Sequence, residues 1–347
     1  MQRRLLSLAI LVPALVVGLA VGAIWLDYRA FLAESLRARD AEPYFVIPKG
    51  ASLRQVAEQL VADGHLRQPY FFVALAYVSD RATHIQAGEY AWPPGTTPRD
   101  LLARFTAGRV VQHAITLVEG WTFRQAVAAL VADEHFAGDL AGLDDVEIMT
   151  RLGRPDDHPE GRFFPDTYHF PRDTERFAVL RRALMRMDEV LAAEWAERAS
   201  GLPLKTPYEA LILASIIEKE TAVTGERAEI AGVFVRRLGR GMRLQTDPTV
   251  IYGLGEDYDG RLRKKDLQTD TPYNTYVRDG LPPTPIALPG RAAIHAALHP
   301  ADGEALYFVA KGDGSHHFSA TLAEHNQAVR HYILGQGEGE PATGGDR

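Results

Sequence analysis

Residues 47–65 read I-P-K-G-A-S-L-R-Q-V-A-E-Q-L-V-A-D-G-H, and this stretch decides how the first folded unit begins. A strand over residues 44–47 is followed by a turn at Gly50. Ser52, with Gln55 three residues later, forms a capping-box pattern that starts a helix. The apolar positions that follow at helical spacing are Leu53, Val56, Ala57 and Leu60. The stretch therefore predicts a strand, a turn and a capped amphipathic helix that ends near Gly64.

The same module occurs a second time in the chain, at residues 117–135. With an offset of 70, the identical pairs are Gly50/Gly120, Arg54/Arg124, Gln55/Gln125, Leu60/Leu130, Val61/Val131, Ala62/Ala132, Asp63/Asp133 and His65/His135. Shared strand and cap chemistry is the alternative explanation. The number of identities in register favours a genuine internal repeat, although two copies do not make a solenoid.

Further helices and strands follow from periodicity and from turn residues. The predicted helices cover 69–78, 97–108, 177–199, 208–221 and 228–238, and the predicted strands cover 88–92 and 306–310. Gly, Pro and Asp crowd residues 239–290, which predicts loops, where binding residues are often found. The mixture of separate helices and strands predicts an α+β fold.

An apolar segment of 22 residues without charge runs from Leu5 to Leu26. At about 1.5 Å per residue it can cross a hydrocarbon layer of roughly 30 Å. A cleaved signal peptide is the alternative, but its apolar region is usually only about 7–15 residues long. We therefore predict a retained single-pass anchor. Arginines flank the segment on both sides, so charge gives its orientation only weakly.

Composition excludes several classes of protein. The net charge is −7 and the basic residues are scattered, so a nucleic acid is not a predicted partner. Without cysteine the chain has no thiolate nucleophile, thiolate metal ligand or disulfide. His295 and His299 stand four residues apart, but there is no H-E-x-x-H frame and no evident third ligand, so no metal site is predicted. No G-x-S-x-G elbow indicates a serine hydrolase.

Two glutamates end the apolar helix predicted at 208–221, in the sequence A-S-I-I-E-K-E-T-A. Burial there would raise the pKa of a carboxyl group, as a general acid requires. The solvated end of a core helix is the structural alternative. Glu218 and Glu220 both project from apolar faces, so periodicity does not choose between them.

Polar residues on the Pro- and Gly-rich segments downstream suit a groove for sugars. The candidates for substrate binding are Gln245, Asp247, Thr249, Asn274 and Tyr276, together with Glu220. Asp247 has a second interpretation, because an aspartate before Pro248 often makes an Asx-type bond to its own loop.

The chain resembles the YceG-like family of endolytic murein transglycosylases, from its N-terminal apolar helix to about residue 333. The motifs that carry the resemblance are E-G-R-F-F-P-D-T-Y (160–168), A-S-I-I-E-K-E-T-A (214–222), G-M-R-L-Q-T-D-P-T-V-I-Y-G (241–253), P-Y-N-T-Y (272–276), G-L-P-P (280–283), H-x-F (316–318) and H-N (325–326). Residues from Tyr44 also resemble a LysM module, with Ala51 where that module usually has Asp. The resemblance implies that Glu218 is the catalytic residue.

The resemblance also implies an organisation and a location. The implied parts are a cytoplasmic tail (1–4), a transmembrane helix (5–26), a connector (27–42), a LysM-like subdomain (43–108), a catalytic domain (109–335) and a disordered tail (336–347). The catalytic part would lie in the periplasm, held at the inner membrane. Its partners would be peptidoglycan glycan strands and peptidoglycan synthases such as penicillin-binding proteins.

The implied reaction cleaves the β-1,4 bond between N-acetylmuramic acid and N-acetylglucosamine and closes a 1,6-anhydro ring. A single carboxyl serves first as acid and then as base, and no metal or organic cofactor is required. A muramidase that activates water with a second carboxylate is the nearest alternative. A non-catalytic, membrane-anchored scaffold that binds peptidoglycan is an alternative of another class.

Overall fold

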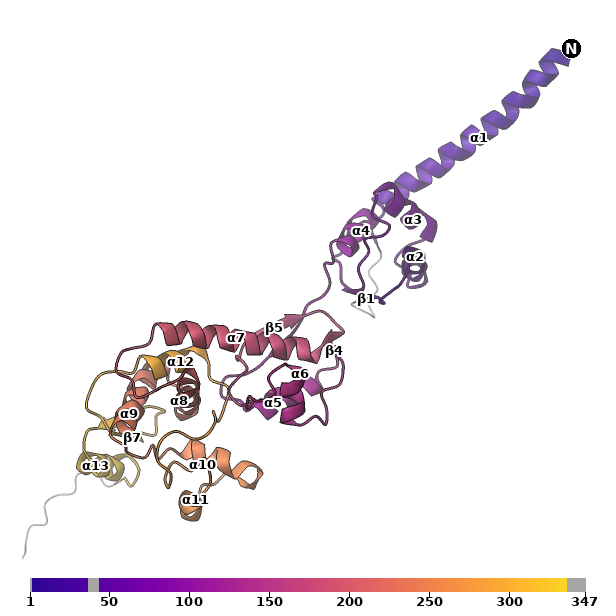
Figure 1. Cartoon of the computed structure of the whole chain (residues 1–347). Coiled ribbons are helices and arrows are strands. Elements are labelled where there is room, and N and C mark those ends of the chain that lie inside the picture. The colour runs from indigo at the N-terminus through magenta and orange to yellow at the C-terminus, as the bar shows by residue number, and fades with distance from the viewer. Residues whose placement is uncertain (1, 37–43, 336–347) are drawn as a thin grey trace, which may run out of the picture. The chain divides into compact units, whose positions relative to one another are not determined.

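The structure is a computed structural model that describes residues 2–36 and 44–335. It divides into two compact units, Met1–His113 with His169–Asp173, and Ala114–Tyr168 with Thr174–Arg347. Both units combine helices with short strands, as Figure 1 shows, so the α+β prediction is confirmed. The predicted disordered tail at 336–347 and the end of the predicted connector lie outside the described residues.

The first unit begins with a long helix and continues as a small α+β assembly. Its elements are α1 (Gln2–Ala33), β1 (Phe45–Ile47), α2 (Leu53–Ala62), α3 (Pro69–Val78), β2 (Gly88–Tyr90) and α4 (Pro98–Thr106). β1 and β2 pair antiparallel, with Phe45 opposite Tyr90. Within α1, Leu11–Ala33 is long and apolar enough to cross a membrane, a range that overlaps the predicted span Leu5–Leu26. Only its end packs on the unit, where Phe31 contacts Phe71.

Helices dominate the second unit. Its elements are β3 (His113–Thr116), α5 (Phe123–Ala132), β4 (Phe136–Ala137), α6 (Asp145–Arg151), β5 (Thr167–Phe170), β6 (Thr174–Glu175), α7 (Arg176–Ala196), α8 (Pro207–Glu220), α9 (Arg227–Gly239), α10 (Asp247–Leu254), α11 (Lys264–Gln268), α12 (Arg291–Leu298), β7 (Tyr307–Ala310), β8 (His316–Ser319) and α13 (Leu322–Tyr332), with single 3-10 turns at Thr224–Glu226 and Gly255–Asp257. The strands form the two-stranded pairs β3–β5, β4–β6 and β7–β8. β3 and β5 each contain a point where the chain passes between the units.

The central element of the second unit is α8, which packs against α7, α9, α10 and α12 (Figure 1). Thr206 caps its start by accepting a bond from the Glu209 N–H, and Pro207 occupies the first turn, where no N–H is needed. Residues 210–217 are buried on every side of the helix. A helix apolar all round belongs in the middle of a core, and here it fixes the position of the polar turn that follows.

The two copies of the internal repeat form corresponding helices. α2 and α5 begin and end 70 positions apart, each with the predicted capping box, from Ser52 and from Thr122. The preceding glycines are also alike, with φ of 82° at Gly50 and 77° at Gly120. The correspondence supports the repeat. The strands match less well, because β3 ends at Thr116, one residue before the counterpart of Ile47.

Candidate active site

The last turn of α8 presents Glu218 and Glu220 to different surroundings. Residues two apart on a helix differ by about 200° around its axis, so their side chains leave in nearly opposite directions. Both follow the buried run that ends at Ile217. The neighbours of each carboxyl therefore distinguish between them, which periodicity does not do.

Both oxygens of Glu218 are bound to the protein. Oε1 accepts from the Arg227 guanidinium at 2.9 Å, and Oε2 accepts from the Gly290 N–H at 3.0 Å. Only 5% of the side chain is exposed. Burial raises the pKa of Glu218, while the Gly290 N–H and the charge of Arg227 act in the opposite direction. This carboxyl joins α8 to the start of α9 and to the residue before α12.

The turn of the second repeat copy lies beside Glu218. The Lys219 ammonium donates to the Gly120 carbonyl at 3.2 Å. Gly120 and Trp121 also exchange backbone hydrogen bonds with Leu288, at 2.9 and 2.7 Å. The end of α8, the 120–121 turn and the segment before α12 thus form one hydrogen-bonded assembly.

Glu220 faces an open pocket of about 330 Å³. The pocket is lined by Glu220, Arg237, Leu244, Gln245, Thr246, Asp247, Tyr276, Tyr307, Phe308, Leu322 and His325. The Thr246 hydroxyl donates to Glu220 Oε1. Glu220 is one of the lining residues, so a ligand in the pocket would lie beside this glutamate.

The environment of Glu220 favours its protonated form. The pKa of its carboxyl is raised from 4.5 to about 7. Burial is the largest cause and the charge of Asp247 also raises the pKa, while the Thr246 hydroxyl, His316 and Arg237 partly oppose these effects. A carboxyl with a pKa close to neutral is able both to give and to accept a proton at physiological pH. Glu220 thus has the chemistry of a general acid and base.

Besides Glu220 itself, three of the predicted binding residues line this pocket. Gln245, Asp247 and Tyr276 all line it. The Tyr276 hydroxyl donates to Asp247 Oδ1 at 2.6 Å. Gln245 adopts φ of 51°, in the left-handed region that non-glycine residues rarely occupy, and its N–H donates to the Thr275 carbonyl at 3.2 Å. These three predicted residues therefore lie at one pocket together with Glu220.

Thr249 and Asn274 support the pocket from behind and do not line it. Both side chains are fully buried. Thr249 Oγ1 donates to the Thr246 carbonyl at 2.7 Å. The Asn274 amide donates to three carbonyls within residues 266–269 and its oxygen accepts from the Tyr276 N–H at 2.9 Å. Their polar groups are occupied by the protein, which fixes the two segments that carry Gln245 and Tyr276.

The loop expected around Asp247 is in fact a helix. Asp247 and Pro248 begin α10, and the cap residue Thr246 makes no side-chain capping bond. The carboxyl of Asp247 accepts from Tyr276 and does not make the Asx-type bond considered from the sequence. The proline gave a misleading signal, because the first turn of a helix tolerates it as well as a loop does.

Arg237, Tyr307 and His325 are pocket residues that the sequence analysis did not select as candidates. The Arg237 guanidinium donates to the carbonyls of Leu306 and Leu244 at 2.6 and 2.7 Å, which joins α9 to both walls of the pocket. His325 stacks on Tyr307, and burial lowers the pKa of its imidazole, which keeps it neutral. A buried arginine within an amphipathic helix is the signal that could have identified Arg237.

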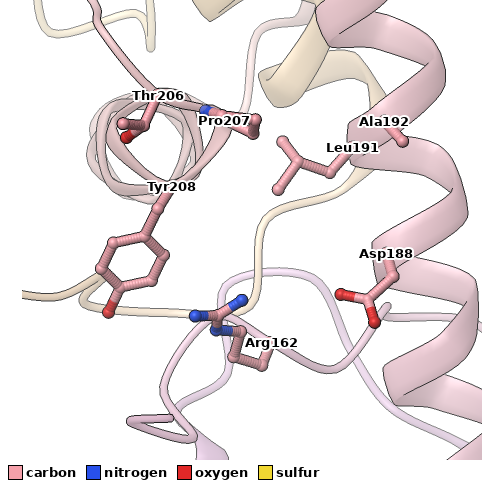
Figure 2. A pocket seen from close by; sticks show the side chains of 7 residues that line it. All are labelled: Arg162, Asp188, Leu191, Ala192, Thr206, Pro207 and Tyr208. Carbon is pink, nitrogen blue, oxygen red and sulfur yellow. The ribbon is translucent and has the colours of Figure 1, made fainter.

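A separate hollow of about 350 Å³ lies at the other end of α8 (Figure 2). It is lined by Arg162, Asp188, Leu191, Ala192, Thr206, Pro207 and Tyr208. The Arg162 guanidinium lies over the Tyr208 ring, 4.6 Å from its centre. Because α8 has 14 residues, this hollow is about 20 Å from Glu220 along the helix axis. It is not part of the same site.

Comparison with known proteins identifies the family to which this chain belongs. The model of the YceG-like family matches residues 45–331. An endolytic murein transglycosylase of Bacillus subtilis is 34% identical over 84% of this chain and 85% of its own length, and one of Streptococcus pneumoniae is 27% identical over 83% of this chain and 58% of its own length. A crystal structure of a YceG-like protein from Listeria monocytogenes is similar with a TM-score of 0.53 and 30% identity, covering 82% of this chain and 98% of that one. The chain belongs to the YceG-like family.

Proposed function

We propose that this protein is an endolytic murein transglycosylase that cleaves the β-1,4 bond between N-acetylmuramic acid and N-acetylglucosamine and leaves a 1,6-anhydro end. The names of the relatives from B. subtilis and S. pneumoniae support the enzyme class. The bond and the 1,6-anhydro product are those that the resemblance to the family implies, and the pocket around Glu220 offers a carboxyl suited to the proton transfers. That pocket is the observation that carries the proposal.

In the proposed mechanism Glu220 acts twice. As the neutral acid, it gives its proton to the glycosidic oxygen while the bond from that oxygen to C1 of the muramyl residue breaks. As the carboxylate, it then accepts the proton of the C6 hydroxyl while that oxygen bonds to C1. No water is consumed, and the enzyme returns to its starting protonation state. The pKa of about 7 is suited to both steps.

The remaining pocket groups suit a glycan strand. Gln245 and Thr246 offer neutral hydrogen-bonding groups, and Tyr276 offers a ring on which a sugar can stack. The Asp247 carboxylate would stabilise positive charge that develops at C1. Burial and the bond to Asp247 raise the pKa of Tyr276, so its hydroxyl stays protonated and keeps donating.

Glu218, which the resemblance implies as the catalytic residue, is the competing assignment. Its two oxygens already accept from Arg227 and Gly290, so it has less capacity for a substrate. Glu220 has one side-chain donor, Thr246, and lies at a pocket. We therefore propose Glu220 as the acid and base, and Glu218 as a positioning residue that fixes the end of α8.

Two isosteric variants test the assignment. Glycan strands are incubated with the full-length protein in detergent, and the products are separated and weighed by mass spectrometry. Glu220→Gln should abolish cutting, whereas Glu218→Gln should keep measurable cutting with the same products. Glu229→Gln, an exposed glutamate on α9 that does not line the pocket, is the matched control and should remain active. The reverse pattern, with Glu218→Gln inactive and Glu220→Gln active, would return the role to Glu218.

Product mass separates the transglycosylase from a muramidase. Hydrolysis adds one water to the product and gives a reducing end, and Asp247 would be the carboxylate to activate that water. Products lighter by one water support the 1,6-anhydro ring. If Glu220→Gln bound glycan as the wild type does and neither protein cut it, the protein would instead be an anchored peptidoglycan-binding scaffold.

We also propose that α1 is a retained single-pass anchor in the inner membrane, with residues from about 40 onward in the periplasm. The apolar length of Leu11–Ala33 supports an anchor. In the proposed organisation, residues 43–108 form a LysM-like subdomain and residues 109–335 the catalytic domain. The element order β1, α2, α3, β2 and the β1–β2 pair support the subdomain. Peptidoglycan synthases are the proposed protein partners.

Protease digestion of intact and of opened spheroplasts tests the topology. A protease added outside should degrade the large C-terminal part, and a fragment containing α1 should stay with the membrane. Protection of the C-terminal part in intact spheroplasts would contradict both the topology and the substrate.

A further inference from the structure

Three side chains from α7 and α12 form a potential metal-binding group in the second unit. Each of Glu194, His295 and His299 offers one ligand atom, and these atoms lie within 4.8 Å of one another. His295 lies on α12 and His299 is the C-cap residue that follows this helix, and their two rings stack on each other. Glu194 comes from α7, which packs against α12. The third ligand that the sequence did not reveal lies 101 residues before His295.

The carboxyl of Glu194 is held in place for this role. Its Oε2 lies 2.9 Å from His295 Nδ1, and its Oε1 accepts from Arg291 at 2.7 Å. Its side chain is only 10% exposed. Oε1 is therefore occupied by Arg291, and Oε2 is directed to the histidines, where it could bind a metal through one oxygen.

Both ring nitrogens of His299 face a carbonyl oxygen, although a neutral imidazole ring can donate only one hydrogen bond. Nε2 lies 2.9 Å from the Glu197 carbonyl, and Nδ1 lies 3.2 Å from the His295 carbonyl. A neutral imidazole has only one N–H, so one nitrogen then turns a lone pair toward a carbonyl oxygen. A small rotation of the ring would relieve this contact and present that lone pair to a cation.

We propose that Glu194, His295 and His299 bind a divalent transition metal, with zinc as the best match. Two imidazole nitrogens and one carboxylate oxygen are a common zinc set, whereas magnesium and calcium prefer oxygen alone. The bonds of such a site are about 2.0–2.2 Å long, which places ligand atoms about 3.5 Å apart in a tetrahedron. The rings now stack at 4.2 Å, so one of them must turn as the metal binds.

The site is open to solution. All three residues line a cavity of about 760 Å³, from which a water molecule could supply the fourth ligand. Arg227 lines the same cavity and also binds Glu218. A bound metal would cross-link α7 to α12, the helix that begins directly after Gly290. It would thus stiffen the wall that holds Glu218 without taking part in the proton transfers of Glu220.

Calorimetric titration tests the site on the full-length protein in detergent, prepared without a polyhistidine tag and treated with a chelator. Zn²⁺ should bind at one ion per chain and raise the midpoint of thermal unfolding, whereas Mg²⁺ should do neither. Co²⁺ should give the intense visible absorption of a four-coordinate site. His295→Ala should weaken Zn²⁺ binding at least tenfold. The control His331→Ala, an exposed histidine on α13, should leave the affinity unchanged.

The outcomes decide the proposal even if one variant folds poorly. His299→Ala loses the contact with Glu197 and could unfold, but the His295 side chain is 57% exposed, so its removal leaves the core intact. Equal Zn²⁺ affinity in His295→Ala and wild type would overturn the proposal, as would the absence of one-to-one binding at 100-fold excess of metal. Neither result would affect the proposed glycan cutting, which is measured separately by product mass.

Discussion

Glycan cutting by this protein should decline as the pH rises through about 7. The first step needs Glu220 in its protonated form, and burial raises the pKa of that carboxyl to about 7. About nine tenths of the molecules then carry the proton at pH 6 and about one tenth at pH 8, so kcat/KM should fall roughly tenfold between them. With its ordinary pKa of 4.5, the carboxyl would be protonated more than about a hundredfold less often at pH 7.

The variant Asp247→Asn should shift the pH at which glycan cutting declines. The charge of Asp247 raises the pKa of Glu220, so its removal should shift the decline toward lower pH. The other charged groups that act on Glu220 are His316 on β8 and Arg237 on α9, and both remain in this variant. Glu218→Gln is the control, and its decline should stay near pH 7 even if its overall rate is lower.

The assay is the initial rate of product release from glycan strands at low substrate concentration, measured from pH 5 to 9. Low concentration makes the profile report the free enzyme. A rate that stays constant from pH 6 to 8 would refute the assignment of the acid. A decline that Asp247→Asn leaves in place would refute the charge coupling between the two carboxylates.

Three further predictions concern stability, measured by urea denaturation. Because the folded-state pKa of Glu220 lies above its ordinary value, wild type should lose stability relative to Glu220→Gln as the pH rises from 4.5 to 7, by at most about 3 kcal/mol. A gain in the stability of wild type relative to Glu220→Gln over the same pH range would contradict the sign. Asn274→Ala should cost about 2–3 kcal/mol, because a fully buried side chain loses its bonds to three carbonyls, one of them buried and two partly buried. A cost below about 0.5 kcal/mol would show that the amide is dispensable. Gly161→Ala should cost about 2–4 kcal/mol, because φ at Gly161 is +77° and an added Cβ would lie 2.4 Å from Pro285 Cβ. The control is Gly142→Ala, where φ is +76° but an added Cβ would meet no described residue within 4 Å. This control should cost about 1 kcal/mol.

Local signals predicted the early helices well. Pro69 at the start and a polar stretch after Val78 marked α3 at its observed bounds, and the capping boxes placed α2 and α5. Short-range patterns were less informative where the helix had no distinctive cap. α12 begins after Gly290 without a side-chain cap and has only eight residues, and it was not predicted. α10 was taken for a loop because its proline lies in the first turn.

The site depended on contacts between distant residues, which the sequence does not contain. Glu218 and Glu220 have equivalent apolar neighbours within α8, and they differ through tertiary contacts such as those of Glu218 with Arg227 and Gly290 and that of Glu220 with Thr246. Gln245, Asp247 and Tyr276 were recognised as polar candidates, but the carboxyl that they surround could not be identified from spacing. Likewise, no pattern connects Glu194 with His295, because tertiary packing alone brings them together.

The two turns of the internal repeat are subject to different constraints. At Gly120 the turn binds Lys219 and Leu288, so a change there would disturb the residues that hold Glu218. At Gly50 an added Cβ would meet nothing within 4 Å among the described residues. One copy of the duplicated motif thus holds the end of α8, while in its counterpart the positive φ of Gly50 is the constraint that remains. Related chains should therefore accumulate substitutions at residues 49 and 51 while they preserve residues 119–121.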